Sequence, residues 1–571
     1  MNRNAPPGLY PSQPVQAVID RMLEFGETSV PYFFQLLESA DPLVARIGAV
    51  ALTKVNHLDE RYLPQVLNAL DRDIAWLPTV LTRIGTPEAA EAAVRQYLNS
   101  RSSPHNQEMF AVVAFGANAL PAIMRAAQCG NDCDEQTHFL LGYALGEMRE
   151  GQQEAAASLL KIAEDATQSA YVRHGALRMI SFVGEPGLPI EQGLLELAER
   201  EPEFKGTVDH ALIGIKSSHA GAILAEFLKS GADRLVLRDI AELGPNGVSA
   251  GMTVTSLLDS NDLSERVMAV RTLGYIGFTS AASKLIDLLN DPTSAQLNWV
   301  AAESLGRMQA KVAIPALRNA AESHWYPPVR DAANKALAHI ESAAGYESKF
   351  HRKNFSFDYF QFQHMDMEPC ESISLESLEE PQDRKLYAYN NPEALEQLAY
   401  DSVVLSYGAR DEEQQMAEDP GGIIRVNPGN IIEHRTNITQ VPDVALRLAS
   451  GWLAGSDRGE WGGELVHIQD DGTATVVLND NVEDIYQLGQ RYIALSGLAH
   501  MTMNSGRVLE LIEATDGTWT VHEWRGLPGA PRSSAFMETG ELLINTASGG
   551  SLLLNESGDF RMANCEKPDK G

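Results

Sequence analysis

Apolar residues recur at helical spacing through the first 340 residues of the chain. Ala and Leu stand at i, i+3, i+4 and i+7 in successive segments, a pattern that predicts helices with one buried face. The segments 269–273, 301–305 and 333–337 align without gaps at steps of 32 residues. A fixed period of this size predicts a solenoid, in which each helix pair buries its apolar face only against its neighbours.

An arginine recurs at one position of this repeat. The four arginines are separated by 127, 93 and 64 residues, close to four, three and two periods, and they are Arg46, Arg173, Arg266 and Arg330. In stacked helix pairs such an arginine pairs with an aspartate or a carbonyl of the adjacent unit, so we expect a structural ladder. Contact with a ligand is the alternative. Asn298 stands at the ladder position of one unit and departs from the pattern.

The repeat unit has the form Asp-Pro-x-x-x-Arg-x-x-Ala-x-x-Ala-Leu, matched from Asp41 to Leu52 and partly matched from Arg266 to Leu273. This motif resembles HEAT repeats, in particular the short HEAT-like repeats of phycobilisome lyases. The resemblance covers residues 12–343 and implies an α-solenoid of helix pairs that binds a protein partner along its concave face. It does not carry named functional residues over to this chain.

A second period begins after the helical pattern ends. Gly422, Gly463, Gly506 and Gly549 follow one another at steps of 41, 43 and 43 residues. Each opens an alternating strand, a hairpin turn and a second strand. Residues 395–566 are therefore predicted to form an antiparallel β domain of four blade-like repeats, which resembles a β-propeller. A closed four-bladed ring, an open fragment and a five-bladed ring all fit this pattern.

Between the two repeats, residues 344–394 are predicted to be a linker or arm. They include an aromatic, strand-like run at 350–362. The predicted fold class is thus multidomain, α then β, with the helical solenoid first and the antiparallel β domain second.

The charge of the chain narrows the range of partners. The 571 residues carry a net charge of −32, of which residues 1–345 hold −12 and residues 346–571 hold −20. Such a field repels phosphate backbones and anionic lipid, so we expect no nucleic acid and no membrane as partner. A protein with a basic surface fits better. The N-terminus lacks the apolar core of a signal peptide, and a cytoplasmic location is expected.

One loop stands apart from both repeats. Residues 455–463 join two predicted strands and have no counterpart in the other blade-like units. Polar and aromatic side chains on such a loop are typical of a binding site, and the candidates for partner binding are Asp457, Arg458, Glu460 and Trp461. The alternative is a tight turn, held by an Asp–Arg pair, whose tryptophan fills the blade.

The chain shows no motif for catalysis, a cofactor or a metal. A Gly-x-Ser-x-Gly elbow, a Walker A loop, a dinucleotide fingerprint and His-Glu-x-x-His are all missing from the sequence. Cys129 and Cys133 lack the second ligand pair of a zinc site. We therefore expect a non-enzymatic scaffold or adaptor, with the acidic β domain as its second surface. The alternative is an enzyme, either of the bilin-lyase type or a hydrolase acting through residues 455–463.

Overall fold

The computed structural model forms two compact units, residues 1–226 and 227–571, which are described separately. The described residues are 13–72, 74–100, 107–128, 134–231, 235–342, 392–408, 423–425, 432–500 and 503–563. The aromatic run at 350–362, most of the predicted linker and all four cysteines lie outside these ranges.

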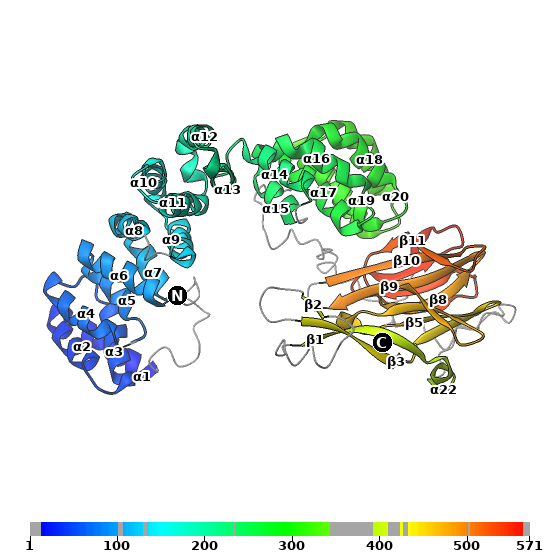
Figure 1. Cartoon of the computed structure of the whole chain (residues 1–571), viewed down its shortest axis with the longest axis horizontal. Coiled ribbons are helices and arrows are strands. Elements are labelled where there is room, and N and C mark those ends of the chain that lie inside the picture. Colours follow the sequence, from blue (N-terminus) through cyan, green and yellow to red (C-terminus); the bar gives the residue numbers. More distant parts are fainter. Residues whose placement is uncertain are drawn as a thin grey trace, which may run out of the picture. The chain divides into compact units, whose positions relative to one another are not determined.

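Helices in two layers make up the first unit (Figure 1). Helices α3, α5, α7, α9, α11 and α13 each pack on the next, and α4, α6, α8, α10 and α12 do the same in the second layer. The helices are α1 (Gln13–Leu23), α2 (Val30–Leu37), α3 (Pro42–Thr53), α4 (Leu63–Leu70), α5 (Leu77–Ile84), α6 (Pro87–Ser100), α7 (Gln107–Phe115), α8 (Leu120–Ala127), α9 (Glu135–Glu147), α10 (Gln152–Glu164), α11 (Ala170–Val183), α12 (Glu191–Arg200), α13 (Lys205–Gly214) and α14 (Ala220–Lys229). The predicted α-solenoid is confirmed.

The ends of these helices follow from local chemistry. Asp41 caps α3, where its carboxylate accepts a hydrogen bond from the backbone N–H of Leu43 at 2.9 Å. Pro42 then occupies the first helical position, where no backbone donor is needed. Gly85 ends α5 with φ of 72°, a left-handed conformation that favours glycine. The Asp-Pro and Gly signals of the repeat therefore fix where its helices start and stop.

Residues 107–127 are long and apolar enough to cross a membrane by composition. They form two helices of the solenoid, α7 and α8, joined by a short 3-10 turn. Met109, Val112 and Ile123 are each at most 1% exposed in the core of the first unit. Burial between neighbouring repeats therefore accounts for the apolar character of this stretch.

The same two-layered packing continues in the second unit. Helices α15, α17, α19 and α21 pack in succession, and α18 packs on α20. Their bounds are α15 (Leu235–Glu242), α16 (Gly251–Ser256), α17 (Leu263–Ile276), α18 (Ala282–Asn290), α19 (Ala295–Arg307), α20 (Ile314–Ser323) and α21 (Pro327–Ser342).

Four antiparallel sheets follow, with a short helix α22 (Pro392–Leu395) before them. The strands are β1 (Tyr400–Gly408), β2 (Ile423–Arg425), β3 (Ile432–Gln440), β4 (Val444–Leu448), β5 (Gly451–Ser456), β6 (Glu464–Gln469), β7 (Ala474–Leu478), β8 (Val482–Leu488), β9 (Arg491–His500), β10 (Met503–Glu513), β11 (Trp519–Leu527), β12 (Pro531–Phe536), β13 (Leu542–Thr546), β14 (Gly550–Leu554) and β15 (Phe560–Met562). The first sheet has the order β1-β3-β2, and each of the others joins four consecutive strands in chain order. The antiparallel β domain is confirmed, and within the described strands the sheets do not join into one barrel.

The sheets share apolar layers in chain order. Ala445 packs with Tyr400 of the first sheet, whereas its neighbour Leu446 packs with Ile485 of the third. Leu495 of the third sheet packs in turn with Ile544 of the fourth. The alternation of side chains along a strand thus buries most of β5 and β6 and the centre of β9 on both faces.

Candidate functional site

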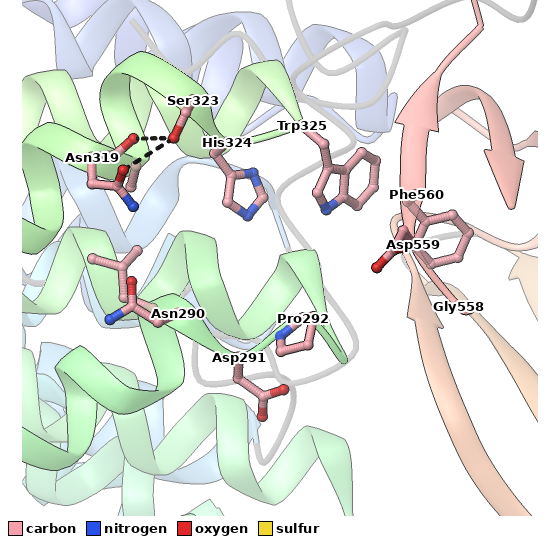
Figure 2. Close-up of a pocket in the computed structure, with 12 residues that line it drawn as sticks. Asn290, Asp291, Pro292, Asn319, Ser323, His324, Trp325, Gly558, Asp559 and Phe560 are labelled. Carbon is pink, nitrogen blue, oxygen red and sulfur yellow. Dashed lines mark hydrogen bonds between the residues drawn. The ribbon is translucent and has the colours of Figure 1, made fainter. Parts of the chain in front are cut away.

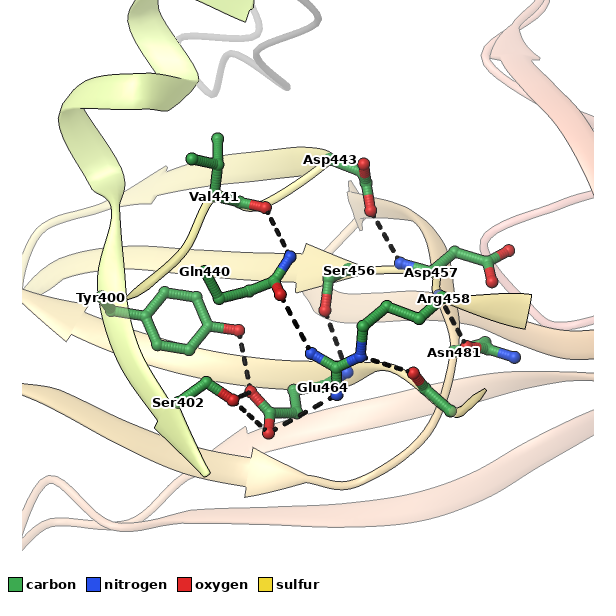
Figure 3. Close-up of polar contacts among 11 residues, drawn as sticks. Tyr400, Ser402, Gln440, Val441, Asp443, Ser456, Asp457, Arg458, Glu464 and Asn481 are labelled. Carbon is green, nitrogen blue, oxygen red and sulfur yellow. Dashed lines mark hydrogen bonds and ion pairs between the residues drawn. The ribbon is translucent and has the colours of Figure 1, made fainter. Parts of the chain in front are cut away.

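The loop at residues 455–463 connects β5 to β6 through a short 3-10 turn, Gly459–Trp461 (Figure 3). The backbone N–H of Asp457 donates to the carboxylate of Asp443 at 2.8 Å. The carboxylate of Asp457 accepts from the N–H of Gly459 at 2.8 Å. Asp457 is therefore the residue that shapes the turn.

Arg458 points back into the β domain. Its Nε donates to the carbonyl oxygen of Gly462 at 2.7 Å and its Nη1 to Oε1 of Gln440 at 3.3 Å. Its Nη2 lies 3.6 Å from Oε1 of Glu464, whose side chain is only 3% exposed. The guanidinium thus closes a buried polar cluster and does not face the solvent.

Glu464 is the centre of that cluster (Figure 3). Its carboxylate accepts hydrogen bonds from the hydroxyls of Tyr400 at 2.9 Å and Ser402 at 2.7 Å. Burial and the neighbouring carboxylate raise the pKa of Tyr400. A carboxylate buried with two hydroxyl donors and a guanidinium is well compensated for its loss of water. Sequence analysis did not single out any of these three residues.

The other two predicted residues face outward. Oε2 of Glu460 lies 2.9 Å from Nε2 of His500 at the end of β9. Trp461 is 55% exposed. The four candidates of this loop therefore divide into an inward pair, Asp457 and Arg458, and an outward pair, Glu460 and Trp461.

A second group of acids lies beside this loop, at the start of β8. Burial, together with the negative charges of Asp457, Asp484 and Asp443, raises the pKa of Glu483 to about 7. Burial also raises the pKa of Asp484, which accepts hydrogen bonds from the hydroxyls of Tyr486 at 2.5 Å and Ser534 at 2.9 Å. Glu483 is thus the group of this region whose protonation state changes near neutral pH.

Arg173 of the predicted ladder connects three helical elements. Its Nε donates to the carbonyl oxygen of Ala163 at the end of α10, at 2.6 Å. Its Nη2 lies 2.7 Å from Oε2 of Glu201, and its guanidinium lies 4.3 Å from the ring centre of Phe204. Both of these residues follow α12, so one side chain links neighbouring repeats.

The ladder positions farther along the chain contact different neighbours: Arg330 and Asn298 contact the end of the preceding helix, whereas Arg266 lies near the residue that follows the next helix, α18. Nη1 of Arg330 donates to the carbonyl oxygen of His324 at 2.6 Å. Nη2 of Arg266 lies 4.0 Å from Oδ2 of Asp291. Asn298, which replaces arginine, donates through Nδ2 to the carbonyl oxygens of Leu288 at 2.7 Å and Asp291 at 2.8 Å. Arg46 lies half-buried on α3.

Two cavities lie where the last helical repeats of the second unit meet the β domain. One, of about 340 Å³, is bounded by the ends of α18 and α20 and by the turn before β15 (Figure 2). In it the rings of Trp325 and Phe560 are 5.2 Å apart, centre to centre. Burial lowers the pKa of His324 to about 4, so this histidine is neutral at physiological pH.

The other cavity, of about 540 Å³, lies between the start of α17 and strands β9 to β11. Arg507 pairs there with Asp480 and lies 3.9 Å from Glu523. Burial raises the pKa of Glu523, although Arg507 and Arg266 oppose the shift. Of the charged residues that line this cavity, Asp262, Asp480 and Glu523 are acidic and Arg507 is basic, so its lining is mainly acidic.

Metal binding has no support in the part of the chain that the structure describes. Among those residues no three or more His, Cys, Asp or Glu side chains are grouped so that they could hold a metal ion.

The stacked helix pairs define an α-solenoid, and comparison with known families identifies its repeat. Residues 252–338 match the family model of HEAT repeats, so this segment, from α16 to α21, consists of HEAT repeats. No curated protein matches the chain in sequence.

Several solved structures are similar to parts of the chain. Human deoxyhypusine hydroxylase in complex with glycerol is 18% identical, with a TM-score of 0.17, over 44% of this chain and 98% of that one. Kap121p is 13% identical, with a TM-score of 0.35, over 73% of this chain and 48% of its own length. The complex of CpcE and CpcF of phycocyanin lyase from Nostoc sp. PCC7120 is 19% identical, with a TM-score of 0.23, over 45% of this chain and 94% of that one.

Proposed function

We propose that this chain is a non-enzymatic scaffold that binds a protein partner along its helical solenoid. The observation that carries the proposal is a set of aromatic side chains left in water on the first unit. Their exposed fractions lie between 41 and 67%, and they are Phe25, Tyr32, Phe110, Phe139 and Tyr171. Aromatic residues are enriched where one protein binds another, because a partner removes their apolar surface from water.

The β domain is proposed to be propeller-like and to supply a second, acidic surface. Its four sheets follow one another in the chain and share apolar layers, as blades do. Trp461 and Glu460 are proposed as the partner-contacting part of the loop, because both are exposed. The inward contacts of Asp457 and Arg458 support a structural role for that pair.

One observation favours the alternative of a hydrolase acting beside this loop. Glu483 has a pKa raised to about 7 and lies near Asp457, and such groups serve as general acids in enzymes. Neither of the two cavities described above includes Glu483 among its lining residues. The scaffold therefore remains the function that the geometry supports best.

The test is affinity capture of the tagged full-length chain from its native extract, followed by chemical crosslinking and mass spectrometry. A stoichiometric protein partner crosslinked to the solenoid is the expected result. Failure to recover any stoichiometric protein partner would contradict the scaffold. Hydrolysis of a test ester or peptide by the purified chain, lost in Glu483→Gln, would favour the alternative.

A further inference from the structure

A stripe of four side chains runs along α9 at steps of four residues: Glu135, Phe139, Tyr143 and Glu147. Residues four apart lie one above another on a helix, so two aromatic rings are bracketed by a carboxylate at each end. Phe182 of α11 adds a third ring. Its centre lies 5.6 Å from that of Phe139 and 6.5 Å from that of Tyr143.

Two glycines hold this third ring in place. A methyl group on Gly142 would lie 2.6 Å from Cδ2 of Phe182, and one on Gly146 would lie 2.7 Å from the carbonyl oxygen of Phe182. Only residues without a side chain allow α11 to approach α9 so closely. The close approach of α9 and α11 therefore places Phe182 directly beside the two rings of the stripe.

The cluster remains open to water. Phe139 is 45% exposed, although the rings of Tyr143 and Phe182 pack against it. An aromatic surface of this kind gains free energy when a partner removes it from water.

Carboxylates stand at both ends of the stripe, and an arginine offsets the charge of one of them. Glu135, with a side chain that is 76% exposed, pairs with Arg178 at 2.5 Å. Glu147 accepts a hydrogen bond from Tyr143, and burial together with this carboxylate raises the pKa of Tyr143. The last turn of α9 holds no basic residue, so the negative end of the helix dipole adds to Glu147. Residues 1–226 as a whole carry 17 basic and 28 acidic side chains.

We propose that this α9–α11 face, as part of the proposed scaffold function, binds a partner segment in which basic side chains flank an apolar or aromatic one. The apolar side chain covers the three rings, one basic side chain meets Glu147, and another shares the carboxylate of Glu135 with Arg178. These two carboxylates stand about 18 Å apart along the helix, a span that five or six residues of extended peptide cover. Cations are also attracted to the faces of the exposed rings.

The probe is a fluorescein-labelled synthetic decapeptide in which a tryptophan has two lysines on each side. The control is a matched peptide in which glutamates replace the lysines. Fluorescence anisotropy with the full-length protein is expected to show binding of the basic peptide only. Phe139→Ala is expected to weaken this binding by about fivefold or more, whereas Leu43→Ala, a more exposed apolar residue on α3 of the same unit, leaves it unchanged.

Charge is tested at Glu147, the last residue of α9. Glu147→Gln is expected to weaken binding by about two- to threefold and to reduce its dependence on salt. Glu154→Gln, an exposed glutamate on the neighbouring α10, is the control. Equal binding of both peptides, or binding unchanged in Phe139→Ala and Glu147→Gln, would overturn the inference.

Capture from the native extract separates this inference from the scaffold proposal. If wild type and Phe139→Ala recover the same partner in equal amounts, the α9–α11 face is excluded while the scaffold stands. If neither recovers a partner, the scaffold itself fails. Analytical sedimentation tests whether the face binds a second copy of the chain. A concentration-dependent dimer that is lost in Phe139→Ala would assign the face to that second copy and overturn the proposed partner.

Discussion

The backbone N–H of Gly526 donates a hydrogen bond to the carbonyl oxygen of Thr293 at 2.7 Å. This bond joins the loop between α18 and α19 to β11, the edge strand of its sheet. Ser294 forms a parallel bridge with Gly526, and a methyl group on Gly526 would lie 3.2 Å from Cβ of Ser294. A loop of the HEAT segment thus covers the open edge of a sheet, which protects the edge from pairing elsewhere.

Gln296→Ala is expected to weaken this junction. Gln296 is 1% exposed, and its Nε2 donates to the carbonyl oxygen of Leu527 at 3.0 Å, across 231 residues of sequence. Its loss leaves a buried carbonyl without this donor and lowers the free energy of unfolding of residues 227–571 by about 1–2 kcal/mol.

Urea unfolding followed by tryptophan fluorescence measures this change, because six of the seven tryptophans lie in residues 227–571. The matched control is Gln192→Ala on α12. The side chain of Gln192 is exposed and donates a hydrogen bond to Glu196, a near neighbour on the same helix. Its effect is expected to stay within about 0.5 kcal/mol. Equal unfolding curves for wild type and Gln296→Ala would contradict a stabilising role for this bond.

The helical fold was predictable because its signals are local. Asp-Pro starts, glycine ends and the 32-residue spacing all act within one repeat, so α17, α19 and α21 appear at the predicted positions. Asn298, the departure from the ladder, lies in α19, directly after the loop that docks on β11. The sequence marks this unit as different but does not contain the reason, because the β domain that contacts it begins some 100 residues later.

The strands were only partly predictable. Gly422, Gly463 and Gly549 lie directly before or at the start of β2, β6 and β14 as expected, whereas Gly506 lies inside β10. Strand β8 was missed because Glu483 and Asp484 near its start are typical of a turn. Their burial is compensated by Tyr486, Ser534 and protonation, which only the packed sheets provide.

The side-chain contacts of the candidate site were also only partly predictable from the sequence. Loop residues 455–463 were found because their composition is unusual, but the direction of each side chain depends on distant partners. Glu464 meets Tyr400 across 64 residues and Ser402 across 62. No local pattern in an apolar strand indicates that its glutamate will be the buried partner of Arg458.

Arg458→Ala is expected to destabilise the β domain. The substitution removes the guanidinium that faces the buried Glu464, whose hydrogen bonds to Tyr400 and Ser402 remain. The expected cost is about 2–3 kcal/mol, at the lower end for a buried ion pair that loses one partner. Denaturant unfolding gives the value.

Adding Glu464→Gln to Arg458→Ala is expected to recover part of the loss, because the neutral amide needs no counter-charge. Arg447→Ala is the control, since Arg447 pairs with Asp470 at the surface, where loss of an ion pair changes stability little. An Arg458→Ala variant as stable as wild type would show that the arginine does not hold the loop.

Gly146→Ala is expected to destabilise the first unit although alanine is the better helix former. A methyl group there meets the carbonyl oxygen of Phe182, a backbone atom that cannot move independently of α11. The expected cost is about 1–2 kcal/mol after the gain in helix propensity. Gly206→Ala on α13, where nothing lies within 4 Å, is expected to be neutral or to stabilise by up to about 1 kcal/mol. Thermal melting followed by circular dichroism distinguishes the two, and equal effects would mean that α9 and α11 do not touch at Gly146.

Glu483→Gln is expected to change how the stability of the β domain depends on pH. The pKa of Glu483 rises from its ordinary value of 4.5 to about 7 in the folded chain, chiefly through burial. Between these values the folded chain holds a proton that the unfolded chain has released, so this group favours folding at low pH. Its contribution to the free energy of unfolding is complete below about pH 4.5 and is lost as the pH rises through 7. Because the side chain is partly exposed, the change amounts to about 1–2 kcal/mol.

Urea unfolding at pH 5 and at pH 8 measures this contribution. Wild type is expected to lose stability toward pH 8, and Glu483→Gln, which stays neutral, to lose less. Asp484, whose pKa is also raised by burial, is present in both proteins. Glu538→Gln, at an exposed position of the same domain, is expected to follow wild type. If Glu483→Gln shows the full wild-type loss between the two pH values, Glu483 is ionised in the folded chain, and the proposed general acid of the hydrolase alternative is excluded as well.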